Sequence, residues 1–182
     1  MLTLKNIEKE KFDEFVCNHK TKSHFLQTSA WGEFAKENKG VTPYYLGLTD
    51  HNNKILGTAL LLQKKLPLNY CYFYCPRGFV IDYNNNELVK EMTEELRKFA
   101  KKKKGIYVKI DPDIKLHNLD IDGNVIDGED NHKLIEYLQS LGYKHLGFNK
   151  AFEHSEPRYT FRLELKDSID DIVIIFIIRL KK

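Results

Sequence analysis

Apolar residues change their spacing along the chain, and each change of period predicts a different element. In residues 2–18 they recur at intervals that suit a short amphipathic helix. A second short helix is expected to begin at Thr28 or Ser29, because a hydroxyl side chain there can cap it, and to carry Trp31. The amino-terminal part is therefore expected to be helical.

The next segments have the composition of strands. Residues 43–49 and 54–63 are apolar and rich in residues that suit a pleated sheet, and the polar cluster 50–53 between them predicts a turn. Residues 69–75 form a third expected strand, in which tyrosines alternate with Cys and Phe, so that the two kinds occupy opposite faces. We expect an antiparallel hairpin followed by a strand covered on both faces.

A helix and a strand follow. Residues 84–86 are asparagines that can cap a helix, and the apolar positions from Leu88 to Phe99 recur at helical spacing until the lysines 101–104. Residues 106–110 alternate as a strand does, and Asp111-Pro112 ends it because proline cannot donate to a ladder.

The last expected elements are a helix over about 131–141, ended by Gly142, and two strands at 143–148 and 158–165. The order is two helices, three strands, a helix, a strand, a helix and two strands. This order predicts an α/β (α+β) fold with a mixed sheet flanked by helices, of the N-acetyltransferase-like type, as a single domain over 1–166.

Residues 167–182 are expected to form a truncated or atypical apolar tail. The run Ile172–Ile178 is much shorter than the roughly 20 residues that a membrane-spanning helix requires, so no membrane span is expected. The oligomeric state is left open, although an exposed strand of this composition could pair with a second copy.

Charge and cysteines narrow the function classes. With 29 Lys and Arg against 26 Asp and Glu, the net charge of +3 does not indicate a dedicated nucleic-acid-binding protein, although it leaves tRNA possible as a co-substrate. The three cysteines form no C-x-x-C pair, which favours a reducing cytosol over a disulfide framework or a zinc site. Charged residues throughout 1–16 argue against a signal peptide. We therefore expect a cytoplasmic protein.

Four segments, in this order, resemble the Fem family of peptidoglycan interpeptide-bridge aminoacyltransferases. They are Phe25-Leu-Gln-Thr-Ser-Ala-Trp-Gly32, Cys75-Pro-Arg-Gly-Phe-Val-Ile-Asp82, Lys109-Ile-Asp-Pro-Asp113 and Glu156-Pro-Arg-Tyr-Thr160. Proteins of this family are about twice as long as this chain and contain two similar acyltransferase-like domains. The resemblance therefore implies that this chain covers the first domain only and that it is a truncated form.

The resemblance also implies an activity. In the Fem family an amino acid passes from aminoacyl-tRNA to an amine on the stem peptide of a peptidoglycan precursor, either a UDP-muramyl peptide or its lipid-linked form. No cofactor beyond the aminoacyl-tRNA co-substrate is implied. The aminoacyl ester is already activated, so positioning and electrostatic stabilisation can supply much of the catalysis, and no catalytic residue is assigned.

Substrate-binding candidates follow from the matching segments. In the family a basic residue just after the tryptophan is thought to meet the precursor's diphosphate; that position falls near Ala35 here, and Lys36 beside it is the candidate. Arg77 leaves a strand beside a glycine, and it is expected either to meet an anion or to pair with Asp82 or Asp111. The full candidate set is Trp31, Lys36, Arg77, Gly78, Lys109 and Arg158.

Three alternatives remain beside this interpretation. An acyl-CoA-dependent N-acetyltransferase would share the element order, but residues 77–82 lack the second glycine of a pyrophosphate cradle. A non-catalytic, precursor-binding remnant would share the ancestry. Residues 118–129 match much of an EF-hand calcium loop, yet no entering helix is predicted before them, so a flexible acidic loop is favoured and no metal is expected.

Overall fold

The computed structural model describes residues 2–20, 24–120 and 122–147. The chain groups into two compact units, Met1–Lys144 and His145–Lys182, and every element described below belongs to the first. Within the described ranges, none of the helices combines the length and the apolar character that crossing a bilayer requires.

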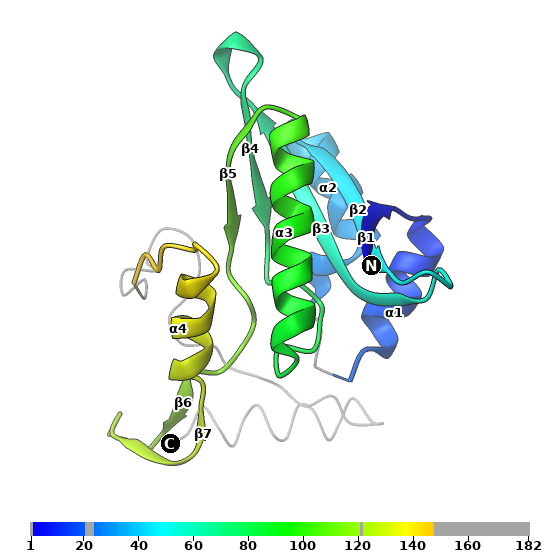
Figure 1. Cartoon of the computed structure of the whole chain (residues 1–182). Coiled ribbons are helices and arrows are strands. Elements are labelled where there is room, and N and C mark those ends of the chain that lie inside the picture. The colour runs from blue at the N-terminus through cyan, green and yellow to red at the C-terminus, as the bar shows by residue number, and fades with distance from the viewer. Residues whose placement is uncertain (1, 21–23, 121, 148–182) are drawn as a thin grey trace, which may run out of the picture. The chain divides into compact units, whose positions relative to one another are not determined.

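A five-stranded sheet forms the centre of the first unit (Figure 1). Its spatial order is the chain order: β1 (Thr3–Asn6), β2 (Thr42–Thr49), β3 (Ile55–Lys65), β4 (Cys71–Cys75) and β5 (Gly105–Ile110). Neighbours from β1 to β4 are antiparallel, whereas β4 and β5 are parallel. The mixed sheet with helices on its faces agrees with the expected fold class.

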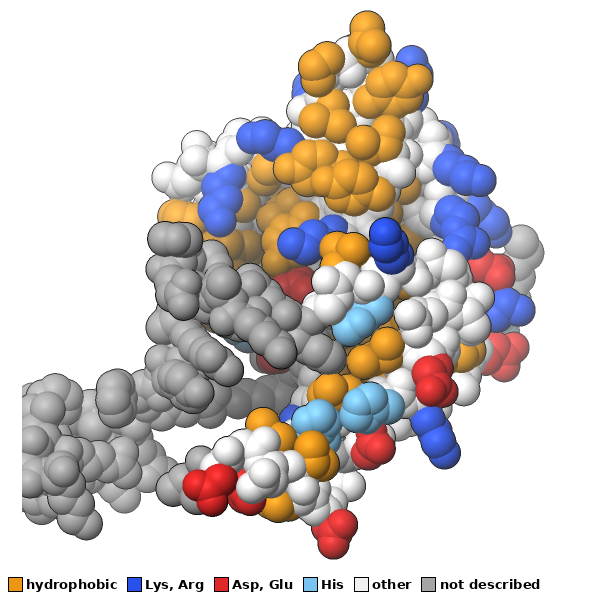
Figure 2. Space-filling view, turned by 90° about the vertical axis from the view of Figure 1, so that its left-hand side faces the viewer, with side chains coloured by type: hydrophobic (Ala, Val, Ile, Leu, Met, Phe, Trp, Pro, Cys, Tyr) orange, Lys and Arg blue, Asp and Glu red, His pale blue; other side chains and the backbone are white. Residues whose placement is uncertain are grey.

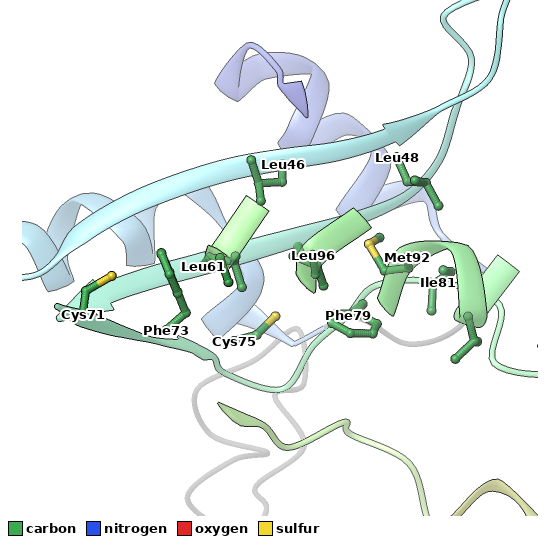
Figure 3. Close-up of a cluster of buried hydrophobic side chains, with 13 residues drawn as sticks. Leu46, Leu48, Leu61, Cys71, Phe73, Cys75, Phe79, Ile81, Met92 and Leu96 are labelled. Atoms are coloured by element: carbon green, nitrogen blue, oxygen red, sulfur yellow. The ribbon is translucent and has the colours of Figure 1, made fainter. Parts of the chain in front are cut away.

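Helix α3 (Asn86–Lys102) connects β4 to β5 and covers one face of the sheet (Figure 1). The Asn85 side chain caps it by accepting a hydrogen bond from the Leu88 backbone N at 3.0 Å, as the asparagine cluster predicted. Figure 3 shows Met92 and Leu96 of α3 facing the sheet residues of this core. Fully buried partners include Leu46, Leu61 and Phe73, so apolar burial holds α3 in place.

The other face carries the first two helices, α1 (Lys9–Asn18) and α2 (Ser29–Lys39), with a 3₁₀ turn η1 (Phe25–Gln27) before α2. Thr28 caps α2, accepting a hydrogen bond from the Trp31 backbone N at 3.3 Å, and Gly40 ends it with φ 58°. Apolar residues of both helices pack on β2 and β3: the buried set is Phe12, Val16, Ala35, Tyr45, Leu60, Leu62 and Val80.

Two predictions of secondary structure that fall on described residues were wrong. Residues 3–6 form β1, so the helix predicted over 2–18 is confined to α1; Leu4 instead packs against the α3 core. Residues 143–147, expected to begin a strand, form none. Tyr143 packs against the core instead, with its hydroxyl 3.3 Å from the Thr93 hydroxyl.

The EF-hand-like segment, expected to be a flexible acidic loop, contains strands. Its residues form an antiparallel hairpin of β6 (His117–Leu119) and β7 (Val125–Asp130), followed by α4 (His132–Ser140). The Asp120 side chain accepts hydrogen bonds from the Asp122 and Asn124 backbone N atoms, so its oxygens close a turn. No group of three or more His, Cys, Asp or Glu side chains in the described ranges could hold a metal.

The remaining expectations fall on other parts of the chain. The strand predicted at 158–165, the apolar tail 167–182 and the domain boundary at 166 all lie outside the described residues.

Candidate functional site

The carboxyl ends of β4 and β5 form the candidate site. Cys75 pairs with Ile110 at the end of this parallel ladder, after which the chain turns away through Pro76-Arg77-Gly78 on one side and Asp111-Pro112 on the other. In sheets with parallel strands, ligands bind where neighbouring strands end and their connections diverge. The order of the strands therefore places Arg77 and Asp111 together at such a point.

Asp111 is held by two donors. One carboxylate oxygen accepts a hydrogen bond from the Tyr74 hydroxyl at 3.1 Å, and the other accepts one from the Arg77 backbone N at 3.0 Å. Burial raises the pKa of Asp111 above its ordinary value, and it outweighs these hydrogen bonds and the positive charges of Arg77 and Lys109, which lower it. Asp111 is thus a partly desolvated carboxyl group beside cations.

The connection after β4 depends on glycine at position 78. A Cβ atom built on Gly78 would lie 2.5 Å from the Cys75 Sγ and 2.8 Å from the Gln27 Nε2, closer than packed atoms approach. Arg77, just before it, has φ 52°, a left-handed backbone conformation that residues other than glycine and asparagine rarely adopt. Close packing therefore determines the path of this loop.

Gln27 holds the same loop from the other side and was missed as a site residue. Its side chain is fully buried; its Nε2 donates to the Pro76 carbonyl, and its Oε1 accepts from the Leu60 backbone N at 3.0 Å. Gln27 belongs to the first matching segment, but a glutamine bonding to residues more than thirty positions away leaves no local sequence signal.

Tyr83 completes the support of the loop. Its hydroxyl accepts a hydrogen bond from the Phe79 backbone N at 2.7 Å, and burial raises the pKa of Tyr83 well above its ordinary value. Tyr83 also lines a cavity of about 620 Å³ between the start of α3 and α4, together with Asn84, Asn86, Asn131 and Tyr137. This hollow contains amide and hydroxyl groups next to the loop.

The structure brings three of the six predicted residues together. Arg77 and Gly78 are in the loop, and the Lys109 Nζ lies 5.3 Å from the centre of the Tyr74 ring, next to Asp111. Figure 2 shows the face of the unit on which β5 lies, where an acidic side chain is partly visible below Lys and Arg side chains. The end of β4 and β5 therefore combines cations with a carboxylate.

The other predicted residues are placed differently. Trp31 stacks on Phe34 and meets Phe25 edge-on, and its buried indole N–H has no hydrogen-bond partner among the described residues. Ala35 is fully buried in the core, whereas the Lys36 side chain is 61% exposed, with its Nζ 3.9 Å from a Glu33 oxygen. Both predicted residues lie on α2. Arg158 lies outside the described residues.

Comparisons with known proteins agree on one relationship. The model of the FemAB family matches residues 7–178. Aminoacyltransferase FemA of Staphylococcus aureus (strain bovine RF122 / ET3-1) is 35% identical over 153 residues, which are 84% of this chain and 36% of FemA. FemA of strain MW2 matches equally.

A solved structure extends this relationship to the fold. The crystal structure of FemX is 31% identical and superposes with a TM-score of 0.63, covering 80% of this chain and 33% of FemX. The chain therefore spans about a third of the length of the curated relatives that it matches.

Proposed function

The chain belongs to the FemAB family, and on that premise we propose that it acts in peptidoglycan-bridge aminoacyl transfer, with the end of β4 and β5 binding the cell-wall precursor. The reaction is attack by an amine of the stem peptide on the carbonyl carbon of an aminoacyl-tRNA ester. The stem-peptide ammonium first gives one proton to a base. The free amine then attacks, a C–N bond forms and the ester C–O bond breaks, and the second proton that the nitrogen loses goes to the released tRNA oxygen.

One observation carries this assignment: Arg77 and Lys109 stand beside a carboxyl group whose pKa is raised by burial. Cations in a partly desolvated site attract the diphosphate or carboxylate of a precursor more strongly than they would in bulk water. Arg77 presents a planar fork suited to two oxygens, and Lys109 adds a point charge. These two side chains are the proposed anion contacts.

We assign Asp111 the role of proton acceptor. Each carboxylate oxygen has two lone pairs, and the contacts with Tyr74 and Arg77 use one on each oxygen, so both oxygens can still accept from a substrate ammonium. A carboxylate with a raised pKa is a stronger base than an ordinary aspartate. On this proposal, an ammonium group bound beside Asp111 gives it a proton before the amine attacks.

The loop geometry argues against the acyl-CoA alternative. A pyrophosphate cradle needs backbone N–H groups that point at the ligand. In this loop the Arg77 N bonds to Asp111, the Phe79 N to Tyr83 and the Val80 N to the Thr58 carbonyl at 3.0 Å. These donors are used within the fold, so they do not form a cradle.

Calorimetric titration with a UDP-linked muramyl pentapeptide tests the proposal, with acetyl-CoA and Ca²⁺ titrated in parallel. We expect saturable precursor binding that Arg77→Gln and Lys109→Gln each weaken about tenfold or more, because each removes a charge-assisted contact. Lys90→Gln, an exposed lysine on α3, is the matched control and should leave affinity unchanged. Binding of acetyl-CoA without precursor binding would contradict the proposal.

A further inference from the structure

The connection between β3 and β4 projects from the sheet with an apolar tip. It contains the 3₁₀ turn η2 (Pro67–Asn69), and Leu68 at its centre is 85% exposed. A turn that only reverses the chain is normally polar. Figure 2 shows hydrophobic side chains gathered over this projection, which is at the top of Figure 1, with Lys and Arg side chains on both sides of it.

The tip has a defined shape. The Leu66 backbone N donates to the Tyr70 carbonyl at 2.8 Å, and the Tyr70 N donates to the Pro67 carbonyl at 3.3 Å, so the turn is closed at its base. Leu68 adopts φ 59°, a left-handed conformation unusual for leucine. The exposed leucine is therefore presented on a closed turn.

Exposed rings and aliphatic groups continue below the tip. Tyr70 is 48% exposed, and Tyr107 and Ile106 at the start of β5 are 50% and 56% exposed. The Tyr72 and Tyr107 rings stack with centroids 5.1 Å apart. Tyrosine is the kind of side chain enriched at the level of lipid headgroups.

Lysines surround this apolar group. Lys65 pairs with Cys71 across β3 and β4, and the Cys71 N donates to the Lys104 carbonyl, so the end of β3, the start of β4 and the end of α3 meet here. Residues 51–81 and 96–110 contain no Asp or Glu. A chain with a net charge of only +3 thus concentrates cations around Leu68, the most exposed leucine of the described residues.

We propose that this projection docks on an anionic lipid bilayer, with Leu68 entering the acyl-chain boundary and the surrounding lysines meeting the headgroups. Stable peripheral attachment takes an apolar insertion together with a basic patch, and both occur at this place. A nucleic acid would use the lysines and the tyrosine rings, but an aliphatic tip offers a base neither a ring to stack on nor a hydrogen bond. The inference goes beyond the proposed transfer reaction and does not depend on it.

Vesicle co-sedimentation of the full chain tests the inference. We expect binding to vesicles of mixed phosphatidylglycerol and phosphatidylcholine, no binding to phosphatidylcholine alone, and weaker binding as salt increases. Leu68→Asp should weaken binding about tenfold or more, because it removes a leucine from the bilayer boundary. Leu119→Asp, at a 53% exposed leucine of the β6–β7 hairpin, is the matched control and should bind as the parent does.

A second pair of variants tests the charges. Lys65→Glu with Lys104→Glu should weaken binding about 25-fold or more, since each lysine near an anionic surface contributes about fivefold. The control is Lys54→Glu with Lys90→Glu, which makes the same change of charge. Lys54 precedes the start of β3, at the opposite end from Lys65, and Lys90 lies near the start of α3, away from Lys104. Comparing matched variants also separates the tip from any lipid binding by the apolar run 172–178.

Several results would overturn the inference. Equal vesicle binding by Leu68→Asp and Leu119→Asp would show that the tip does not insert. Binding of a single-stranded oligonucleotide by a protein that does not bind vesicles would assign the lysines to nucleic acid. A dimer seen in sedimentation velocity, abolished by Leu68→Asp and accompanied by no vesicle binding, would assign the tip to self-association.

Discussion

Replacing Gln27 with methionine removes the amide that joins η1, β3 and the loop of Arg77 while keeping a side chain of similar length. Two buried groups then lose their partner: the Leu60 backbone N–H and the Pro76 carbonyl. Each unsatisfied buried group costs about 1–3 kcal/mol, so the free energy of unfolding should fall by about 2–6 kcal/mol. This loss is large, because the free energy of unfolding of a typical domain is only about 5–15 kcal/mol.

Urea denaturation followed by circular dichroism measures the loss. With a slope of roughly 2 kcal/mol per molar urea, the midpoint of Gln27→Met should fall by about 1–3 M. Gln139→Met changes an exposed glutamine of α4 in the same way and should leave the midpoint unchanged. A Gln27→Met midpoint within about 0.3 M of the parent would refute the reasoning, because the two groups would then have found other partners.

Three further substitutions test separate parts of the account. Gly78→Ala should destabilise the fold by about 1–3 kcal/mol, because the added methyl would meet the Cys75 Sγ; a thermal melt equal to that of the parent would contradict the close packing. Asp111 has a raised pKa, so its carboxyl group stays protonated to higher pH in the native state than in the unfolded chain. As the pH rises above the ordinary pKa of 3.8, ionisation of Asp111 therefore lowers the stability of the fold. The urea midpoint of Asp111→Asn, relative to that of the parent, should therefore rise between acid and neutral pH. A difference between the two midpoints that does not change with pH would argue against a buried carboxyl group at this position. Hydrogen bonds from Lys9 and Tyr45 lower the pKa of Glu33. They therefore stabilise the fold at pH values above the ordinary pKa of 4.5, and this stabilisation is lost as the pH falls through the lowered pKa. Thermal melts of Glu33→Gln should consequently lie below those of the parent at neutral pH and converge with them in acid; a difference that persists in acid would exclude the ion pair.

The sequence was informative wherever one segment determined its own structure. Helix α3 has an asparagine cap, an apolar stripe and a lysine end, and it lies where the pattern placed it. The polar cluster at 50–53 forms the turn between β2 and β3, and the alternation in β4 places Cys71, Phe73 and Cys75 in the core. Periodicity and turn chemistry are local, which is why these elements were predictable.

Features that depend on distant partners were not predictable in the same way. Strand β1 has four residues and exists by pairing with β2, so its sequence alone was taken for part of a helix. Gln27 looked like one member of a motif, and its buried hydrogen bonds appear only when η1 packs beside β3. The sequence suggested Asp111 as a charge partner of Arg77, and the structure adds a hydrogen bond from the Arg77 backbone N that the sequence did not indicate.

The measurement that tests the central claim most directly is a backbone amide NMR titration of the chain with a UDP-linked muramyl pentapeptide. Binding at the proposed site should shift the resonances of residues 77–78 and 109–111 most strongly, and Arg77→Gln should reduce those shifts at equal ligand concentration. Shifts confined to residues 84–86 and 131–137 would indicate that the ligand binds in the neighbouring cavity and not at the proposed site. A spectrum unchanged by saturating precursor would contradict the account.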